Sequence, residues 1–124
     1  MTRDEIVEFA SHWDPLPIHI DAAIARKSVF GDVIGSGVHT LAIYQRLATI
    51  GAYQHWAIVA GKAIRDLSLS NPLRPDTTVR ATITVDSVTP RSATRALVSK
   101  TGRLLAGDLV LMTVHVDSYV LRRG

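Results

Sequence analysis

The chain has 124 residues, the length of one domain of ordinary size, and contains no cysteine. The absence of cysteine excludes thiolate zinc sites, iron–sulfur clusters, disulfides and a cysteine nucleophile. The net charge is +3, from 14 Lys and Arg against 11 Asp and Glu, and the basic residues form no stripe along the sequence. This pattern argues against a nucleic-acid-binding protein. A hydrophobic content of 47% indicates a folded domain with apolar surface that a partner can cover.

The start of the chain is polar and acidic and lacks the apolar core of a signal peptide. No apolar run approaches the roughly 18 residues that a membrane-spanning helix needs. We therefore expect one soluble domain over residues 1–124, located in the cytoplasm and bound to neither membrane nor nucleic acid.

The first predicted helix runs from a cap at Thr2 to about Trp13. Thr2 and Glu5 have the spacing of a capping box, in which the hydroxyl accepts from a backbone N–H of the first turn and the acid reaches back. Apolar residues at helical spacing follow. Pro15 disfavours helical backbone at the residue before it, so we expect the helix to end near Trp13.

A segment bracketed by two prolines follows at Asp14–Asp21, with the sequence DPLPIHID. Each proline fixes a backbone φ angle, so the segment keeps one shape at little entropic cost. Asp14 and His19 can converge on one small molecule and hold a water between them, an arrangement for general acid–base chemistry. In the alternative interpretation Asp14 caps a turn and His19 is a packed loop histidine, and the spacing alone favours that one. Asp21 is expected to cap a short helix over residues 22–27.

A longer helix is predicted from Val38 to about Ile50, capped by Ser36 after a glycine-rich loop. Apolar residues surround it, so we expect a central helix that is buried on most sides. Free backbone N–H groups and the positive end of the helix dipole face whatever lies at its start. Gly37 lets a ligand approach that backbone closely, so an ester or thioester carbonyl placed there would be polarised as in an oxyanion hole. The alternative is an ordinary glycine-rich helix entry with a serine cap.

The second half of the chain predicts antiparallel strands. Residues 78–88 alternate between apolar and polar side chains, as in a strand with one exposed face. We expect a turn at Asn71–Asp76, a hairpin turn at Thr101–Arg103 and a bulge near Gly107. Helices first and strands second predict an α+β fold in which one sheet wraps a central helix. The expected strands are Trp56–Ala60, Ala63–Ser70, Thr78–Val88, Thr94–Lys100 and Leu104–Leu121.

The other histidines carry no recognisable chemistry. They share no metal-ligand spacing with a pair of carboxylates, so no metal site is predicted. His115 alternates within a strand and is expected to be structural. His39 lies one turn into the predicted central helix, where it either lines a site or packs in the core. Ser36 with His39 lacks a third orienting residue, so a serine hydrolase is poorly supported.

Four stretches of the sequence resemble one known family. They are Phe9-Ala10, Asp14–Asp21, Ser36–Thr40 and Pro72–Pro75, and the likeness runs in register over nearly the whole chain. The sequence is similar to the MaoC-like acyl dehydratases, which include the (R)-specific enoyl-CoA hydratases. The Asp-x4-His element in a proline-bracketed loop, followed by Ser-Gly at a helix start, is the most specific part of this resemblance.

The resemblance implies a hot dog fold, in which a long central helix is wrapped by a curved antiparallel sheet. Such domains form dimers through their sheets, so a homodimer is expected. The implied reaction interconverts 2-enoyl and 3-hydroxyacyl thioesters, of CoA or of an acyl carrier, by adding or removing water. The CoA thioester is itself the substrate, and no further cofactor or metal is implied.

The functional positions of the family map onto this sequence one by one. The catalytic acid–base pair would be Asp14 and His19, and the backbone oxyanion donor would be the Gly37 N–H. In the implied mechanism this N–H polarises the thioester carbonyl while the pair holds a water. One of the two removes a proton as the oxygen adds at C3, and one supplies a proton at C2. Neighbouring residues are also expected to contribute to substrate binding, namely Pro17, Ser36, Val38 and His39.

The sequence departs from the family pattern in three places. Leu16 stands where family loops often carry Asn or Gln, so a polar contact would be missing. The usual Arg-Pro-Gly-Asp turn is one residue shorter here, at Arg74–Thr77. Family members commonly begin with a strand before the first helix, whereas Met1 lies almost at the helix cap. We therefore expect either a four-stranded sheet with an exposed edge or a sequence trimmed at its start.

Two other functions are alternatives to a hydratase. A non-catalytic acyl-thioester-binding or partner subunit is suggested by Leu16 and by the short start. A hot dog thioesterase is the second alternative, and such enzymes usually place a carboxylate on or beside the central helix. No Asp or Glu falls between Gly35 and Ile64, so the thioesterase is the weaker alternative.

Overall fold

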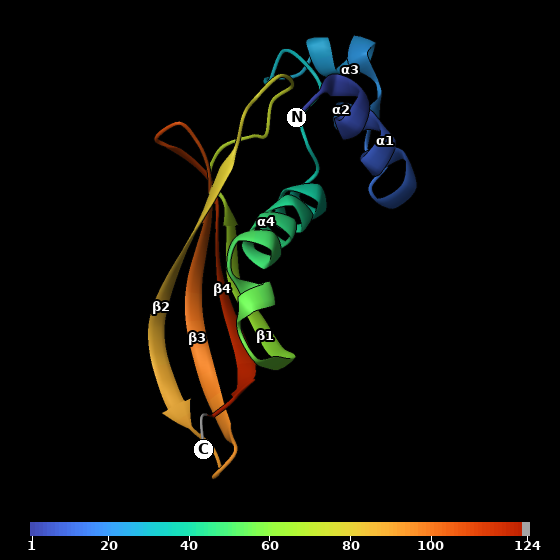
Figure 1. The fold of residues 1–124 in the computed structure, drawn as a ribbon. Helices are drawn as coiled ribbons and strands as arrows, with labels where there is room; N and C mark the ends of the chain where they lie inside the picture. Colours follow the sequence, from blue (N-terminus) through green and yellow to red (C-terminus); the bar gives the residue numbers. More distant parts are fainter. Residues whose placement is uncertain (123–124) are drawn as a thin grey trace.

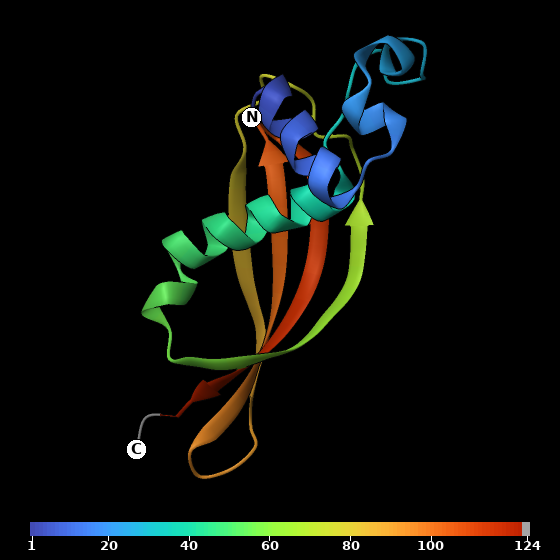
Figure 2. The ribbon, with the colours of Figure 1, turned by 90° about the vertical axis from the view of Figure 1, so that its right-hand side faces the viewer.

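The computed structural model describes residues 1–122, which form two layers (Figure 1, Figure 2). A curved four-stranded antiparallel sheet is one layer, and the long helix α4 lies across one of its faces. Helices α1, α2 and α3 gather at one end of the sheet. This is the predicted α+β arrangement. The elements in chain order are α1 (Arg3–Trp13), α2 (Pro17–Ile20), α3 (Ala22–Arg26), α4 (Gly37–Gly51), η1 (Tyr53–His55), β1 (Ile58–Leu69), β2 (Arg80–Pro90), β3 (Arg95–Ala106) and β4 (Leu109–Leu121).

Side-chain caps begin the helices at the predicted residues. The side-chain oxygens of Thr2, Asp21 and Ser36 accept from first-turn N–H groups of α1, α3 and α4 at 3.2, 3.1 and 3.2 Å. The Thr2 hydroxyl also donates to the Glu5 carboxylate at 3.2 Å, so the capping-box pair is in contact. The sequence did not predict α2 within the proline-bracketed segment. Pro17 takes a position in its first turn, where a backbone N–H is not needed.

The strand order is β1-β4-β3-β2, and every neighbouring pair is antiparallel. The two strands expected at residues 56–60 and 63–70 are one strand, β1, in which the register against β4 shifts at three places. Asp66 has a positive φ of 49° within the last of these irregularities. A four-stranded sheet with β1 and β2 at its edges is therefore the form observed in residues 1–122.

The predicted hairpin turn at Thr101–Arg103 is wrong. Strand β3 runs through these residues, and the chain turns at Gly107-Asp108, where Gly107 has a φ of +59°. Gly102 serves packing instead, because a Cβ there would lie 2.2 Å from the ring of Tyr44 on α4. A glycine inside a strand pattern here marks close contact between helix and sheet, not a turn.

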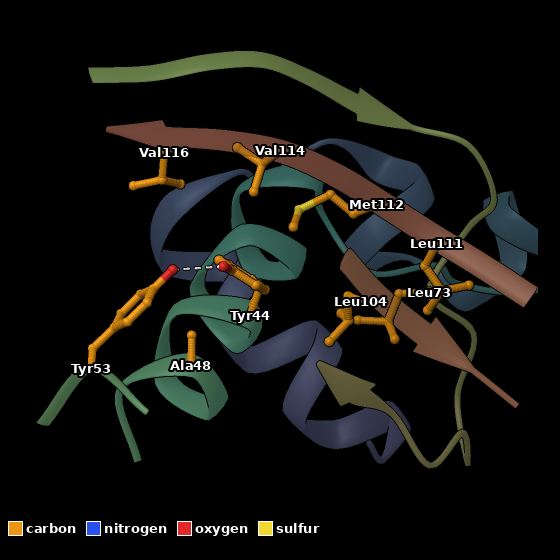
Figure 3. Packing of buried hydrophobic residues seen from close by; sticks show 9 residues of the cluster. All are labelled: Tyr44, Ala48, Tyr53, Leu73, Leu104, Leu111, Met112, Val114 and Val116. Atoms are coloured by element: carbon orange, nitrogen blue, oxygen red, sulfur yellow. Dashed lines mark hydrogen bonds between the residues drawn. The ribbon is translucent and has the colours of Figure 1, made fainter. Parts of the chain in front are cut away.

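The main core lies between α4 and the sheet (Figure 3). Tyr44 is wholly buried, and its hydroxyl is 2.8 Å from that of Tyr53. The expectation that α4 is buried on most sides is wrong for the described chain, because one face rests on the sheet while Val38 and Ile50 are exposed. The buried cluster consists of Tyr44, Ala48, Tyr53, Leu73, Leu104, Leu111, Met112, Val114 and Val116.

Candidate functional site

Asp14 and His19 lie together near the N-terminal end of α4. Asp14 is the C-cap of α1 and His19 lies in α2, so the short turn between these helices brings them together. His19 Nε2 is 3.5 Å from Asp14 Oδ2. Ser36, the N-cap of α4, donates its hydroxyl to the same carboxylate oxygen at 2.7 Å. Three segments of the chain therefore converge on one carboxylate.

The backbone fixes one nitrogen of the His19 ring. Nδ1 lies 2.7 Å from the carbonyl oxygen of Ile34. A carbonyl only accepts, so Nδ1 carries a proton and donates it. Nε2, on the side of Asp14, is therefore the nitrogen that can gain or lose a proton in a reaction. Sequence reasoning missed Ile34 because a backbone carbonyl leaves no signal in the residue type.

The first residue of α4, Gly37, lines a cavity of about 320 Å³ together with His19. Its N–H has no acceptor among the described residues, as expected in the first turn of a helix. A Cβ at Gly37 would lie 2.5 Å from Cδ1 of Leu69, so any other residue would push against that wall. The wall of the cavity therefore contains an unpaired backbone donor at the positive end of the α4 dipole. Its lining residues are His19, Phe30, Ile34, Gly35, Gly37, Thr40, Leu69, Ser70, Asn71, Pro72 and Leu73.

The turn after β1 forms a second wall of this cavity at Ser70–Leu73. The carbonyl of Leu73 accepts from the Gly35 N–H at 2.7 Å, and a Cβ on Gly35 would lie 2.6 Å from the Leu73 side chain. The sequence predicts a turn here from Asn71-Pro72. It gives no signal that this turn lies against the glycine-rich loop, because the contact joins segments that are distant in the chain.

None of the four predicted substrate-binding residues lines this cavity, and Ser36 is buried against Asp14 instead. Pro17 and Val38 are exposed, and the ring of His39 stacks on Phe9 with centroids 4.1 Å apart and planes 9° apart. His39 lines a separate depression of about 360 Å³ between α1 and α4. Burial lowers the pKa of His39, and the charge of Glu5 acts in the opposite direction. Contact of these four residues with a bound substrate stays a prediction.

The wall of the cavity contains the His19 imidazole and the Gly37 backbone donor. The Asp14 carboxylate is in contact with His19, and the Ser36 hydroxyl is in contact with Asp14. Among residues 1–122 no group of three or more His, Asp or Glu side chains has the geometry of a metal site. No helix in the same part of the chain is long and apolar enough to cross a membrane.

Comparison with known proteins shows which family and which solved structures the chain is similar to. A family model described as "MaoC like domain" matches residues 1–105. The MaoC-like dehydratase from Rhodospirillum rubrum is 32% identical, with a TM-score of 0.88 over 100% of this chain and 86% of that one. The (R)-hydratase from A. caviae involved in PHA biosynthesis is 20% identical, with a TM-score of 0.73 over 95% of this chain and 86% of that one. The uncharacterized protein YdeM of Bacillus subtilis (strain 168) is 33% identical over 76 residues, 61% of this chain and about half (54%) of that protein.

The sheet around α4 and its likeness to these solved structures define a hot dog domain, as the sequence predicts. The chain belongs to the MaoC-like dehydratase domain family. That family includes hydratases and dehydratases, which are lyases. The resemblance found in the sequence is therefore confirmed for family and fold.

Proposed function

We propose that the protein is a hydratase/dehydratase that interconverts 2-enoyl and 3-hydroxyacyl thioesters. The observation that supports this most is that His19, which is in contact with Asp14, and the unpaired Gly37 N–H belong to the wall of one cavity. Addition of water to an enoyl thioester needs an acid–base pair for the water and for C2. It also needs a donor for the carbonyl oxygen, on which negative charge develops.

In the hydration direction the thioester carbonyl accepts from the Gly37 N–H, which stabilises the enolate. A water held between Asp14 and His19 adds through its oxygen to C3, and one of its O–H bonds breaks. His19 Nε2 takes this proton, because Nδ1 already donates to Ile34. The pair returns one proton to C2, so the reaction consumes none overall. Dehydration of the 3-hydroxyacyl thioester is the reverse.

Ser36 acts on this chemistry through Asp14. Its side chain is wholly buried and donates to Oδ2 of the carboxylate. This hydrogen bond leaves Oδ1 of Asp14 available for the water. We therefore propose Ser36 as the residue that positions Asp14.

The proposed substrate is a thioester of CoA or of an acyl carrier, and no further cofactor is needed because acid–base groups and a backbone donor suffice. Such thioesters are intracellular, so a cytoplasmic location is part of the proposal.

We also propose a homodimer, because β1 is an edge strand that exposes Val59 and Leu67. A second copy paired there would cover the unpaired backbone groups. Sedimentation equilibrium is expected to give twice the mass of the chain.

The test of function is the loss of enoyl-thioester absorbance when purified protein is added to crotonyl-CoA. Wild type is expected to show the loss, and Asp14→Asn and His19→Ala are expected to slow it by about 10²–10⁴-fold with unchanged circular dichroism. Asp108→Asn, in the exposed β3–β4 turn, is the matched control.

Near-full rates in both variants would show that the assigned roles are wrong. If wild type binds straight and branched enoyl-CoAs without hydrating them, the non-catalytic subunit is favoured. Release of free CoA thiol would favour the thioesterase.

A further inference from the structure

A second cavity has residues of α4 and β1 in its wall, as the cavity of the candidate site does, and lies farther along these two elements. The first cavity has Gly37 of α4 and Leu69 of β1 in its wall, and the second has Gln45 of α4 and Ile64 of β1. Gly37 and Gln45 are eight residues apart and therefore share one face of the helix, about 12 Å apart along its axis. Figure 2 shows β1 running from below the C-terminal end of α4 to its N-terminal end. The two cavities therefore follow one another along the α4–β1 side of the domain.

The second cavity has a volume of about 420 Å³ and a polar end. Ile64 and Val116 form apolar wall, whereas Lys62 and Ser118 bring polar groups. No carboxylate is among its lining residues, which are Gln45, Tyr53, Ile58, Gly61, Lys62, Ala63, Ile64, Val116 and Ser118. An acyl chain that runs away from Gly37 along α4 would reach this polar end.

A wholly buried lysine lies directly behind this wall. Lys100 Nζ donates to the hydroxyl of Ser118 at 2.9 Å and lies 4.2 Å from the centroid of the Tyr53 ring and 5.3 Å from that of Trp56. Burial lowers the pKa of Lys100, while the charge of Asp117 acts in the opposite direction. Asp117 itself is held by the Arg65 guanidinium through hydrogen bonds of 2.8 and 2.9 Å. The lysine charge thus has neutral hydrogen-bonding and aromatic neighbours and no ion pair within residues 1–122.

Ser118 connects this buried charge to the cavity. Its oxygen accepts from Lys100, and its own O–H has no acceptor among the described residues. The side chain is 5% exposed and lines the cavity. A hydroxyl that accepts from an ammonium is a strengthened donor, because hydrogen bonds in a chain polarise one another. The cavity therefore presents an unused donor, a buried cation behind it and the exposed Lys62 at its edge.

We propose that this second cavity binds a carboxylate at the far end of the acyl chain, so that the preferred substrates are ω-carboxy-2-enoyl thioesters. The proposal rests on the proposed function, because it places the thioester carbonyl at Gly37. A chain about 12 Å long contains about ten carbons, since an extended chain advances about 1.2 Å per backbone atom. A neutral alkyl end would leave the Ser118 hydroxyl unpaired, whereas a carboxylate accepts from it and faces Lys100.

The experiment compares kcat/KM for 2-decenedioyl-CoA and 2-decenoyl-CoA, which differ in the terminal carboxylate. Wild type is expected to prefer the dicarboxylic substrate at least about tenfold, the effect of one charge-assisted hydrogen bond. Ser118→Ala and Lys100→Met are expected to remove the preference, chiefly through KM, and to leave 2-decenoyl-CoA within about twofold. Lys27→Met, which removes an exposed charge at the C-cap of α3, is the control and is expected to keep the preference.

Hydration of both substrates without a preference in wild type would overturn the proposal, whether or not the variants fold. The preference in wild type and its survival in a folded Ser118→Ala variant would overturn the role of Ser118 and Lys100. Free decanedioate is expected to inhibit far more weakly than decanedioyl mono-CoA. Equal inhibition would make the cavity an independent carboxylate site and would overturn its assignment to the acyl chain.

Failure of the proposed function gives a different result. If no enoyl-CoA is hydrated, binding of decanedioyl mono-CoA and decanoyl-CoA is measured by the fluorescence of Trp56 in a Trp13→Phe background. Tighter binding of the dicarboxylic thioester would support the carboxylate cavity in a protein that is not a hydratase. Equal binding would overturn the carboxylate cavity as well.

Discussion

The hydroxyl of Ser36 donates to Oδ2 of Asp14 at 2.7 Å, so the residue that caps α4 also holds the candidate catalytic carboxylate. The cap and the site are thus joined in one side chain. Loss of this hydroxyl removes two different interactions, and a matched variant can separate them.

Ser36→Ala is expected to lower kcat for crotonyl-CoA about 10–100-fold, because a carboxylate misplaced by about 1 Å costs a rate factor of this size. The lost cap is also expected to lower the free energy of unfolding by about 1 kcal/mol. Thr2→Ala is the control, because Thr2 caps α1 in the same way without touching Asp14. An equal fall of kcat in both variants would assign the effect to stability and contradict the positioning role.

Gly102→Ala is expected to destabilise the protein by about 1–3 kcal/mol, the cost of overpacking a core. Its new Cβ would lie 2.2 Å from the Tyr44 ring, which is wholly buried between α4 and the sheet. Gly51→Ala is the matched control, because nothing lies within 4 Å of a Cβ at the end of α4. Urea unfolding followed by circular dichroism measures both. Tolerance of alanine at position 102 would show that helix and sheet are not packed this closely.

Local signals in the sequence predicted where α1, α3 and α4 begin and that Asp14 and His19 lie close together. Thr2, Asp21 and Ser36 cap helices with their own side chains, so a few neighbouring residues decide each cap. The proline-bracketed turn likewise brings Asp14 and His19 close together, although Ile34 and Ser36 then hold their side chains in place. Such features depend on short-range geometry, and the residue types reveal them.

Long-range packing was the part that sequence reasoning could not reach. Gly102 has the appearance of a turn residue, and only its contact with Tyr44, from a distant part of the chain, explains it. The apolar residues of α4 surround the helix, so periodicity did not select Tyr44 as the buried one or Val38 as exposed. Lys100 has a charged side chain of a type that is usually exposed, yet it is wholly buried. In each case the deciding neighbour is far away in the sequence.

His39→Phe is expected to stabilise the protein by about 1 kcal/mol at neutral pH, because it removes a buried polar atom without a partner. Nδ1 of His39 is buried and has no hydrogen-bond partner among the described residues, and a Phe ring can keep the stacking on Phe9. Thermal unfolding measures the change. A KM for crotonyl-CoA raised several-fold would instead support substrate binding by His39.

The stability of His39→Phe is also expected to change with pH differently from that of wild type. Burial lowers the pKa of His39 below its ordinary value of about 6.5, so below that pH the unfolded chain binds a proton that the folded chain resists. Wild type therefore loses stability as the pH falls below about 6.5. His39→Phe is expected to flatten this part of the curve. Parallel curves for both proteins between neutral pH and about pH 5 would contradict a buried neutral His39.

Because Tyr44 and Tyr53 are buried, we expect the protein to lose stability at alkaline pH. Their hydroxyls lie 2.8 Å apart, and burial is the largest cause that raises the pKa of each. Above about pH 10 the unfolded chain ionises these groups while the folded chain keeps them protonated, so unfolding becomes easier as the pH rises. Tyr44→Phe removes one of the two contributions, and its free energy of unfolding is expected to fall less steeply above pH 10.

The comparison of wild type with Tyr44→Phe also cancels the effect of Lys100. Burial lowers the pKa of Lys100, so this group makes the free energy of unfolding rise with pH until the pH reaches the ordinary lysine pKa of about 10.4. This effect is opposite in sign to that of the tyrosines. Lys100 is present in both proteins, and their difference therefore reports Tyr44. Urea unfolding at several pH values between about 8 and 11 gives that difference. A constant difference across this range would show that Tyr44 ionises as readily in the folded protein as in the unfolded chain.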